Sequence, residues 1–308
     1  MATHQEVAAF AAQQGLASVE PSTYTPLINP EYVFRTDLVI EMIGFFKMSR
    51  AKAMWLTGMH GSGKTTLVEQ FHAALGWPLI TYAANAQTTA KDLLGGYRPS
   101  AGEWQYRDGP VTVAARAGCS ILIDEYNIIE PEETSGINKF LDGQHMDIEE
   151  TGERIIPEAG FKLFSACNPA DTSRGFFGRK EQDAANTSRF WFVEVPYAEP
   201  AVEIALVGNI LAMALDAEEA KQYAAKMVDV ANRVRAQSMC GSNAEGALEI
   251  TFPTRSLLLW AEGLCVFGEA PNPLHFALER ALTRQARPDT GTKVAIHEIV
   301  ADVFGIAA

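Results

Sequence analysis

The feature that most constrains this chain is the glycine-rich octapeptide Gly58-Met59-His60-Gly61-Ser62-Gly63-Lys64-Thr65. It fits the G-x-x-x-x-G-K-[ST] pattern of a phosphate-binding loop. Glycines let such a loop curl until successive backbone N–H groups point at phosphate oxygens. The lysine of the pattern reaches the β- and γ-phosphates, and the threonine hydroxyl ligates Mg²⁺. The octapeptide therefore predicts a site for ATP and Mg²⁺.

The segments on either side of the octapeptide fit this interpretation. Residues 53–57 form a short apolar run typical of a buried strand. Residues 64–75 carry apolar side chains at helical spacing, at Leu67, Val68, Phe71, Ala74 and Leu75. A helix that begins at the loop adds the partial positive charge of its N-terminus to the phosphate site. A chance match in an ordinary glycine turn is the alternative, and it does not predict this strand, loop and helix order.

A second motif follows 60 residues after Lys64. The run 119–123 is apolar and ends in Asp124-Glu125, which is the Walker B pattern. Asp124 would hold Mg²⁺ through water beside Thr65. Glu125 would orient or deprotonate the attacking water. An apolar run that ends in Asp-Glu is common by itself, and its order after the loop makes the pair of motifs specific.

Three further runs, at 79–82, 161–167 and 190–195, complete five predicted strands. Helical patterns lie between them at 36–46, 88–94, 111–117 and 133–141, and two hairpins are predicted near 97–110 and 145–157. Residues 175–183 are expected to form a flexible polar stretch. Repeated strand-then-helix units predict an α/β fold with a parallel five-stranded sheet between helices and ligands at the strand C-termini.

The composition changes after Pro196, where only helical patterns remain. They cover 199–215, 217–237, 254–267, 272–286 and 292–304. The sequence thus predicts an N-terminal arm over 1–24, an α/β nucleotide-binding core over 25–195 and a small all-α lid domain over 196–308.

Composition and charge exclude several classes. The formal net charge of −13 argues against non-specific binding to nucleic acids or anionic membranes, which both require basic surfaces. No apolar run is long enough to span a membrane, and no signal peptide is recognised. The four cysteines, Cys119, Cys167, Cys240 and Cys265, are far apart, so we expect reduced thiols in a cytoplasmic protein and no zinc site.

These residues bear a resemblance to a known family. The chain resembles AAA+ ATPases of the MoxR-like group, and within it the CobS-type ATPase subunit of aerobic cobaltochelatase. The resemblance runs from about residue 29 to the C-terminus. Beyond the Walker motifs, it rests on His60 in the loop, Asp124-Glu125-Tyr126, Phe161-Lys162-Leu163-Phe164 with Asn168, Arg189-Phe190, and Pro253-Thr254-Arg255 with Trp260-Ala261-Glu262.

The resemblance implies roles that local patterns do not. From its neighbours alone, Asn168 is the turn residue of an Asn-Pro pair. The family pattern makes it the sensor-1 residue, Arg189 the arginine finger that reaches a neighbouring subunit's γ-phosphate, and Arg255 the sensor-2 residue of the lid. The alternative for either arginine is a solvated surface charge. The full nucleotide-binding set is then Gly58, His60, Gly61, Ser62, Gly63, Lys64, Thr65, Thr66 and Asp124, with Thr65 and Asp124 on Mg²⁺.

The resemblance also implies a biological role. It predicts a homo-oligomeric ring, typically a hexamer, that acts as a chaperone or chelatase motor on a metalloenzyme client, with a separate von Willebrand A-type partner chain. Residues 174–188 depart from the cobaltochelatase pattern, so the resemblance supports ATP hydrolysis more strongly than cobalt chelation. Two alternatives stay open: an AAA+ motor that acts on nucleic acid, and a non-enzymatic assembly protein that uses nucleotide as a switch.

Overall fold

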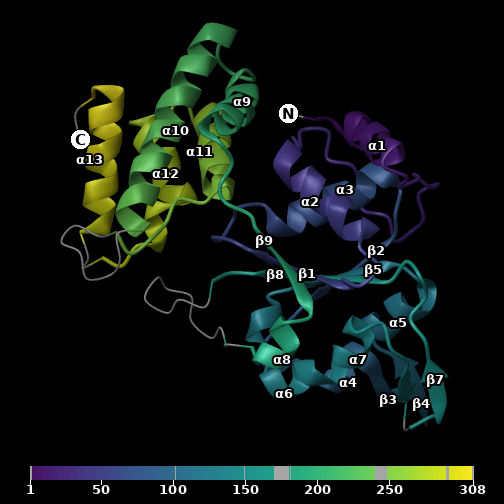
Figure 1. Cartoon of the computed structure of the whole chain (residues 1–308). Helices are drawn as coiled ribbons and strands as arrows, with labels where there is room; N and C mark the ends of the chain where they lie inside the picture. The colour runs from purple at the N-terminus through teal and green to yellow at the C-terminus, as the bar shows by residue number, and fades with distance from the viewer. Residues whose placement is uncertain are drawn as a thin grey trace. The chain divides into compact units, whose positions relative to one another are not determined.

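The computed structural model describes residues 2–100, 102–148, 150–169, 180, 182–239, 248–288 and 291–306. These residues form two compact units (Figure 1). The first unit holds the described residues within 1–58, 63–170 and 177–195, and the second holds those within 59–62 and 196–308. Most of the predicted polar stretch at 175–183 lies outside the described residues. Cys240 also lies outside them.

The first unit is built on a five-stranded parallel sheet, as predicted. Its strands lie in the order β2-β5-β8-β1-β9. Their bounds are β1 Ala53–Thr57, β2 Leu79–Ala83, β5 Ser120–Asp124, β8 Lys162–Cys167 and β9 Phe190–Glu194. The phosphate loop follows β1 and Asp124 ends β5, so both motifs lie at the carboxyl edge of the sheet, where parallel α/β proteins bind ligands.

Helices cover both faces of this sheet (Figure 1). On one face, α1 His4–Gln13, α2 Thr36–Lys47 and α3 Lys64–Leu75 pack against alternate strand residues such as Met54, Leu56 and Phe164. On the other, α5 Pro110–Ala117 and α7 Asn138–Leu141 pack against Trp55, Ile121 and Leu163. Because both faces of the sheet are buried, these strands appear in the sequence as continuous apolar runs.

Shorter elements complete this unit. Two antiparallel hairpins are present where they were expected, β3 Gly95–Ser100 with β4 Glu103–Asp108 and β6 Met146–Ile148 with β7 Glu153–Ile155. The remaining short helices are α4 Ala90–Leu94, α6 Pro131–Thr134 and α8 Ala184–Thr187. On the first hairpin Trp104 is exposed, whereas Tyr106 packs against Tyr97.

The single helix predicted over 133–141 is wrong. The chain forms α6, a 3₁₀ turn over Ser135–Ile137 and then α7. Serine and glycine weaken a helix interior. A side-chain carbon at Gly136 would also lie 3.1 Å from the Ala90 side chain, so the tight packing of α4 selects glycine here.

The N-terminal residues, predicted as an arm, lie within the first unit. Thr3 and Glu6 form a capping box at the start of α1. Val7 and Ala11 are buried in the sheet-covering core, and Ala2 pairs with Phe34.

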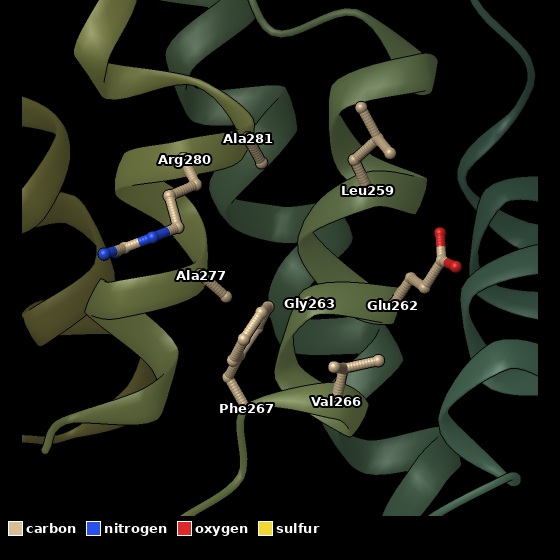
Figure 2. A pocket seen from close by; sticks show the side chains of 8 residues that line it. All are labelled: Leu259, Glu262, Gly263, Val266, Phe267, Ala277, Arg280 and Ala281. Carbon is tan, nitrogen blue, oxygen red and sulfur yellow. The ribbon is translucent and has the colours of Figure 1, made fainter. Parts of the chain in front are cut away.

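The second unit is helical. Its helices are α9 Pro200–Leu211, α10 Ala217–Met239, α11 Thr254–Val266, α12 Pro273–Ala281 and α13 Thr292–Phe304. The fully buried Trp260 sits in their core and donates its indole N–H to the Leu274 carbonyl at 2.9 Å. Outside that core, α11 and α12 border a groove of about 280 Å³ lined by Leu259, Val266 and Phe267 (Figure 2). In the part of the chain that the structure describes, no helix is long and apolar enough to cross a bilayer.

Candidate active site

The phosphate loop closes on itself. Gly63 adopts a left-handed conformation (φ 91°) directly before α3, which a residue with a side chain rarely adopts. The Lys64 amine then folds back and donates a hydrogen bond to the Gly58 carbonyl at 2.9 Å. Lys64 is 8% exposed, so its charge is held inside the loop where a phosphate would meet it.

Three side chains from separate elements meet in a line. The Lys64 amine lies 2.9 Å from Oδ1 of Asn168, and Nδ2 of Asn168 donates to Oε1 of Glu125 at 3.0 Å. Asn168 is 5% exposed and follows β8, the strand between the one that leads to the loop and the one that leads to Glu125. The amide therefore bridges the candidate phosphate-binding amine and the candidate general base.

Oxygen atoms suited to a magnesium ion lie beside this line. The Thr65 hydroxyl donates to Oδ2 of Asp124 at 3.1 Å. Glu69, one helical turn after Thr65, is half-buried, and its pKa is raised first by burial and then by the negative charge of Asp124. Hydroxyl and carboxylate oxygens are the donors that Mg²⁺ prefers. The residues thus fit the cation that the motif implies.

One further atom fits a phosphate ligand. The Ser62 hydroxyl is shielded from solvent, and the described residues supply it with no hydrogen-bond partner. A buried hydroxyl without a partner costs free energy, which an oxygen of a bound phosphate would recover.

Glu125 has an unusual backbone. Its φ is 58°, in the left-handed region that residues other than glycine seldom adopt. Its N–H donates to the Ala166 carbonyl at 2.8 Å and to Oδ1 of Asp124 at 3.0 Å. These bonds hold the strained residue, and such strain commonly accompanies functional positions.

Asn127 and Glu69 were not predicted as site residues. The Asn127 amide donates to the Asn168 carbonyl at 2.8 Å and so fixes the bridging residue. Only the fold brings Asn127 and Asn168 together. Glu69 could have been found from the sequence, because it lies four residues after Thr65 and therefore on the same helix face.

Arg189 lies away from these residues. It directly precedes β9, whose first residue pairs with Ala53 at the start of β1, whereas the loop follows the other end of β1. At about 3.3 Å per residue, roughly 13 Å of strand separates the two ends. Arg189 donates to both oxygens of Asp142, at 2.8 and 3.0 Å, and to the Ala185 carbonyl. It lines an open hollow of about 770 Å³ with Arg50, Lys52 and Trp191.

The remaining predicted residues are placed as follows. Thr66 lies in the first turn of α3, half-buried. His60 is exposed, and its backbone carbonyl accepts a hydrogen bond from the Tyr197 hydroxyl at 3.1 Å. Arg255 is exposed in the first turn of α11, within the second unit.

The sheet-containing part and the helical part of the chain each match a known family. Residues 53–190 match the family described as AAA domain (dynein-related subfamily). Residues 210–303 match the family described as CbbQ/NirQ/NorQ C-terminal. The two matches cover four of the five sheet strands with both Walker motifs, and most of the helical unit.

Relatives of similar length are known. The aerobic cobaltochelatase subunit CobS of Sinorhizobium sp is 24% identical over 80% of this chain and 74% of its own. Protein NorQ of Paracoccus denitrificans is 28% identical over 81% and 86%, and protein CbbQ of Hydrogenophilus thermoluteolus is 29% identical over 82% and 87%. With these matches and the site geometry, the chain belongs to the MoxR-type AAA+ ATPases, as an AAA domain followed by a CbbQ/NirQ/NorQ-type C-terminal domain.

Proposed function

We propose that the protein is a ring-forming ATPase that couples ATP hydrolysis to the remodelling of a partner metalloprotein or to metal insertion into it. The observation that carries the hydrolytic part is the hydrogen-bonded line from Lys64 through Asn168 to Glu125, beside the Thr65 and Asp124 pair. The name of one relative, a cobaltochelatase subunit, motivates the metal-related client.

Each side chain has a role in this proposal. Lys64 contacts the β- and γ-phosphates and offsets their charge. Thr65 and Asp124 hold Mg²⁺, which would neutralise the charge that develops on the phosphate oxygens. Glu125 accepts a proton from the attacking water, and the Asn168 amide holds the Glu125 carboxylate in position beside the lysine.

The position of Arg189 motivates the ring. It lies at the sheet end opposite the phosphate loop of its own chain, so it cannot reach that loop's nucleotide. A neighbouring subunit's γ-phosphate is then its target, where a cation can accelerate hydrolysis about 10³- to 10⁵-fold. Arg255 would act from the helical unit as a second sensor of the nucleotide. A separate von Willebrand A-type chain would link the ring to its client.

The Glu125→Gln variant tests this assignment. It should bind ATP like the wild type and lose turnover by about 10²-fold or more, because the amide cannot accept the proton. The exposed Glu132→Gln variant is the matched control and should keep full activity. Normal hydrolysis by Glu125→Gln would show that another residue is the base. Co-purification of the native complex with metal analysis tests the client.

A further inference from the structure

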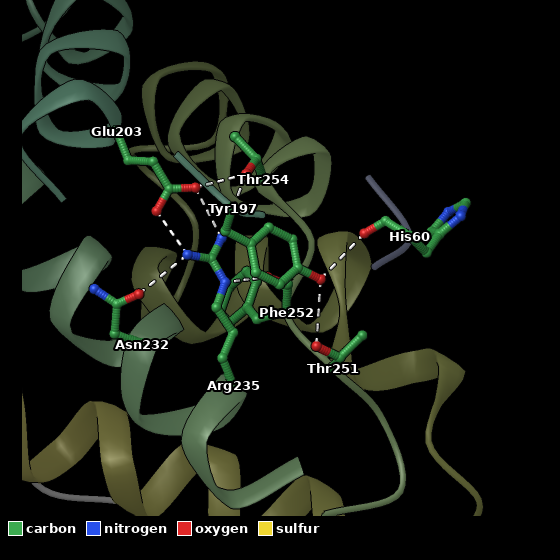
Figure 3. A network of polar contacts seen from close by, with 8 residues as sticks. All are labelled: His60, Tyr197, Glu203, Asn232, Arg235, Thr251, Phe252 and Thr254. Atoms are coloured by element: carbon green, nitrogen blue, oxygen red, sulfur yellow. Dashed lines mark hydrogen bonds and ion pairs between the residues drawn. The ribbon is translucent and has the colours of Figure 1, made fainter. Parts of the chain in front are cut away.

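The second unit contains a buried ion pair between two residues that belong to none of the motifs named above. Glu203 on α9 is 0% exposed and Arg235 on α10 is 5% exposed. Two parallel hydrogen bonds join them, at 2.7 and 2.8 Å (Figure 3). Removing both charges from water is costly, and the remaining donors and acceptors of such a pair therefore need partners.

Those partners are concentrated on one short segment. Nε of Arg235 donates to the Phe252 carbonyl at 2.7 Å. The Thr254 hydroxyl donates to Oε1 of Glu203 at 2.6 Å. Thr254 is the first residue of α11 and directly precedes Arg255. The ion pair thus fixes the backbone that leads into α11.

The same guanidinium supports an aromatic ring. Arg235 lies 4.0 Å from the centroid of the Tyr197 ring, a cation–π contact that holds the tyrosine from one side (Figure 3). The pKa of the Tyr197 hydroxyl is raised, mainly by burial, so the hydroxyl keeps its proton as a donor at neutral pH. It donates to the His60 carbonyl at 3.1 Å and lies 3.5 Å from the Thr251 hydroxyl.

His60 belongs to the tip of the phosphate loop, residues 59–62, which lies within this unit. The C=O and N–H of a trans peptide point in opposite directions. With the His60 carbonyl held by Tyr197, the Gly61 N–H is turned away from Tyr197. Gly61 itself has φ 71°, and a side-chain carbon there would lie 2.6 Å from the Pro253 side chain. The loop tip is therefore held by Tyr197 and packed against Pro253.

We propose that Tyr197 is a positioning residue for the nucleotide phosphates. Its hydroxyl fixes the His60–Gly61 peptide so that the Gly61 N–H is presented to a phosphate oxygen. The Arg235–Glu203 pair fixes Tyr197 and, through Thr254, the start of α11. One buried network thereby joins the loop tip to the helix that carries Arg255. This inference rests on the proposed ATP site and adds residues that neither Walker motif contains.

The test uses the full-length protein and the Tyr197→Phe variant, which loses only the hydroxyl. The dissociation constant of a fluorescent ADP analogue, kcat and KM for ATP, and the melting temperature are measured. Loss of one hydrogen bond to the loop should raise the dissociation constant and KM about 3- to 10-fold. The kcat and the melting temperature should stay near wild type. Tyr223→Phe is the matched control, since Tyr223 packs on Phe304 in the same unit.

An Arg235→Lys variant tests the link to the ion pair. Lysine keeps the charge but loses the bidentate fork and the flat surface under Tyr197. If Arg235 acts through Tyr197, the double variant should bind ADP no more weakly than the weaker single variant. Additive losses would refute that link.

The other outcomes are also decisive. An unchanged dissociation constant in Tyr197→Phe overturns the proposal, and so does a lower melting temperature with unchanged binding, which indicates a purely structural tyrosine. If the wild type binds the ADP analogue and Lys64→Ala does not, the ATP site stands whatever Tyr197 does. If the wild type does not bind it, the proposed function itself fails.

Discussion

The amine of Lys64 and the amide oxygen of Asn168 lie 2.9 Å apart, although 104 residues separate them in the chain. The same asparagine holds the Glu125 carboxylate with its other amide atom. An amide is suited to this position because it accepts from a cation and donates to an anion at once. Under the proposed function, a bound γ-phosphate that drew Lys64 towards itself would release one end of this bridge, and Asn168 would then link the phosphate site to Glu125.

Replacing Asn168 with alanine should therefore slow hydrolysis and spare binding. We expect kcat to fall about 10- to 10²-fold, less than the roughly 10²- to 10⁴-fold contribution of a general base, because Glu125 itself is still present. The dissociation constant of ADP should change little. Steady-state kinetics and ADP titration measure both. Asn209→Ala on the exposed side of α9 is the control, and an unaltered kcat in Asn168→Ala would show that the bridge has no catalytic role.

A mixing experiment tests whether Arg189 acts on a neighbouring subunit. Lys64→Ala and Arg189→Ala should each be inactive alone. Mixed rings should regain part of the ATPase activity, because a Lys64→Ala subunit can lend its Arg189 to an intact loop next to it.

The control mixes two variants that are each defective in the same nucleotide site. Mixtures of Lys64→Ala with Glu125→Gln should stay inactive, since no subunit then combines a working loop with a working base. Activity of Arg189→Ala by itself in the assembled protein would contradict the role in trans.

The buried pair Glu203–Arg235 predicts a large loss of stability when one partner is removed. Glu203→Gln leaves the Arg235 charge buried and unpaired, which should cost about 3–5 kcal/mol. Replacing both residues, as Glu203→Leu with Arg235→Met, should restore much of that loss. Chemical denaturation of the three proteins measures it. Asp302→Asn, which breaks the exposed pair with Arg233, should leave stability near wild type.

His72 predicts a dependence of stability on pH. It is fully buried among aromatic rings, and burial lowers its pKa to about 4. The unfolded chain protonates this histidine near pH 6.5 and the folded chain does not, so stability is full above pH 6.5 and falls as the pH drops towards 4. The slope from one such group is about 1.4 kcal/mol per pH unit.

Denaturation at several pH values checks this. His72→Phe keeps the aromatic packing and should reduce the fall in stability between pH 6.5 and 4. The exposed His145→Gln should leave it unchanged. Equal slopes in wild type and His72→Phe would show that other groups control the acid sensitivity.

Much of the molecule follows from local sequence. The octapeptide with its flanking strand and helix, the Walker B strand and the five helical patterns after Pro196 all depend on neighbours in the chain. For these, periodicity and glycine placement carry the information. The break at Ser135–Ile137 was not predicted, because the packing of Gly136 against Ala90 overrode the helical pattern.

The roles of single polar residues depended on contacts between distant segments. Local sequence makes Asn168 a turn residue, and only the β5-β8-β1 strand order places it between Lys64 and Glu125. The local sequence around Arg189 forms no recognisable motif. The parallel pairing of β1 with β9 places Arg189 at the end of the sheet opposite the phosphate loop.

Tyr197, Glu203 and Arg235 carry no pattern at all. Their burial and hydrogen bonds exist only once α9, α10 and the start of α11 have packed. The sequence by itself therefore determined the fold class and the chemistry of the phosphate loop, because those depend on local backbone geometry. The tertiary structure decided which polar groups meet, because a buried hydrogen bond forms only between atoms that the packing of the core has already brought together.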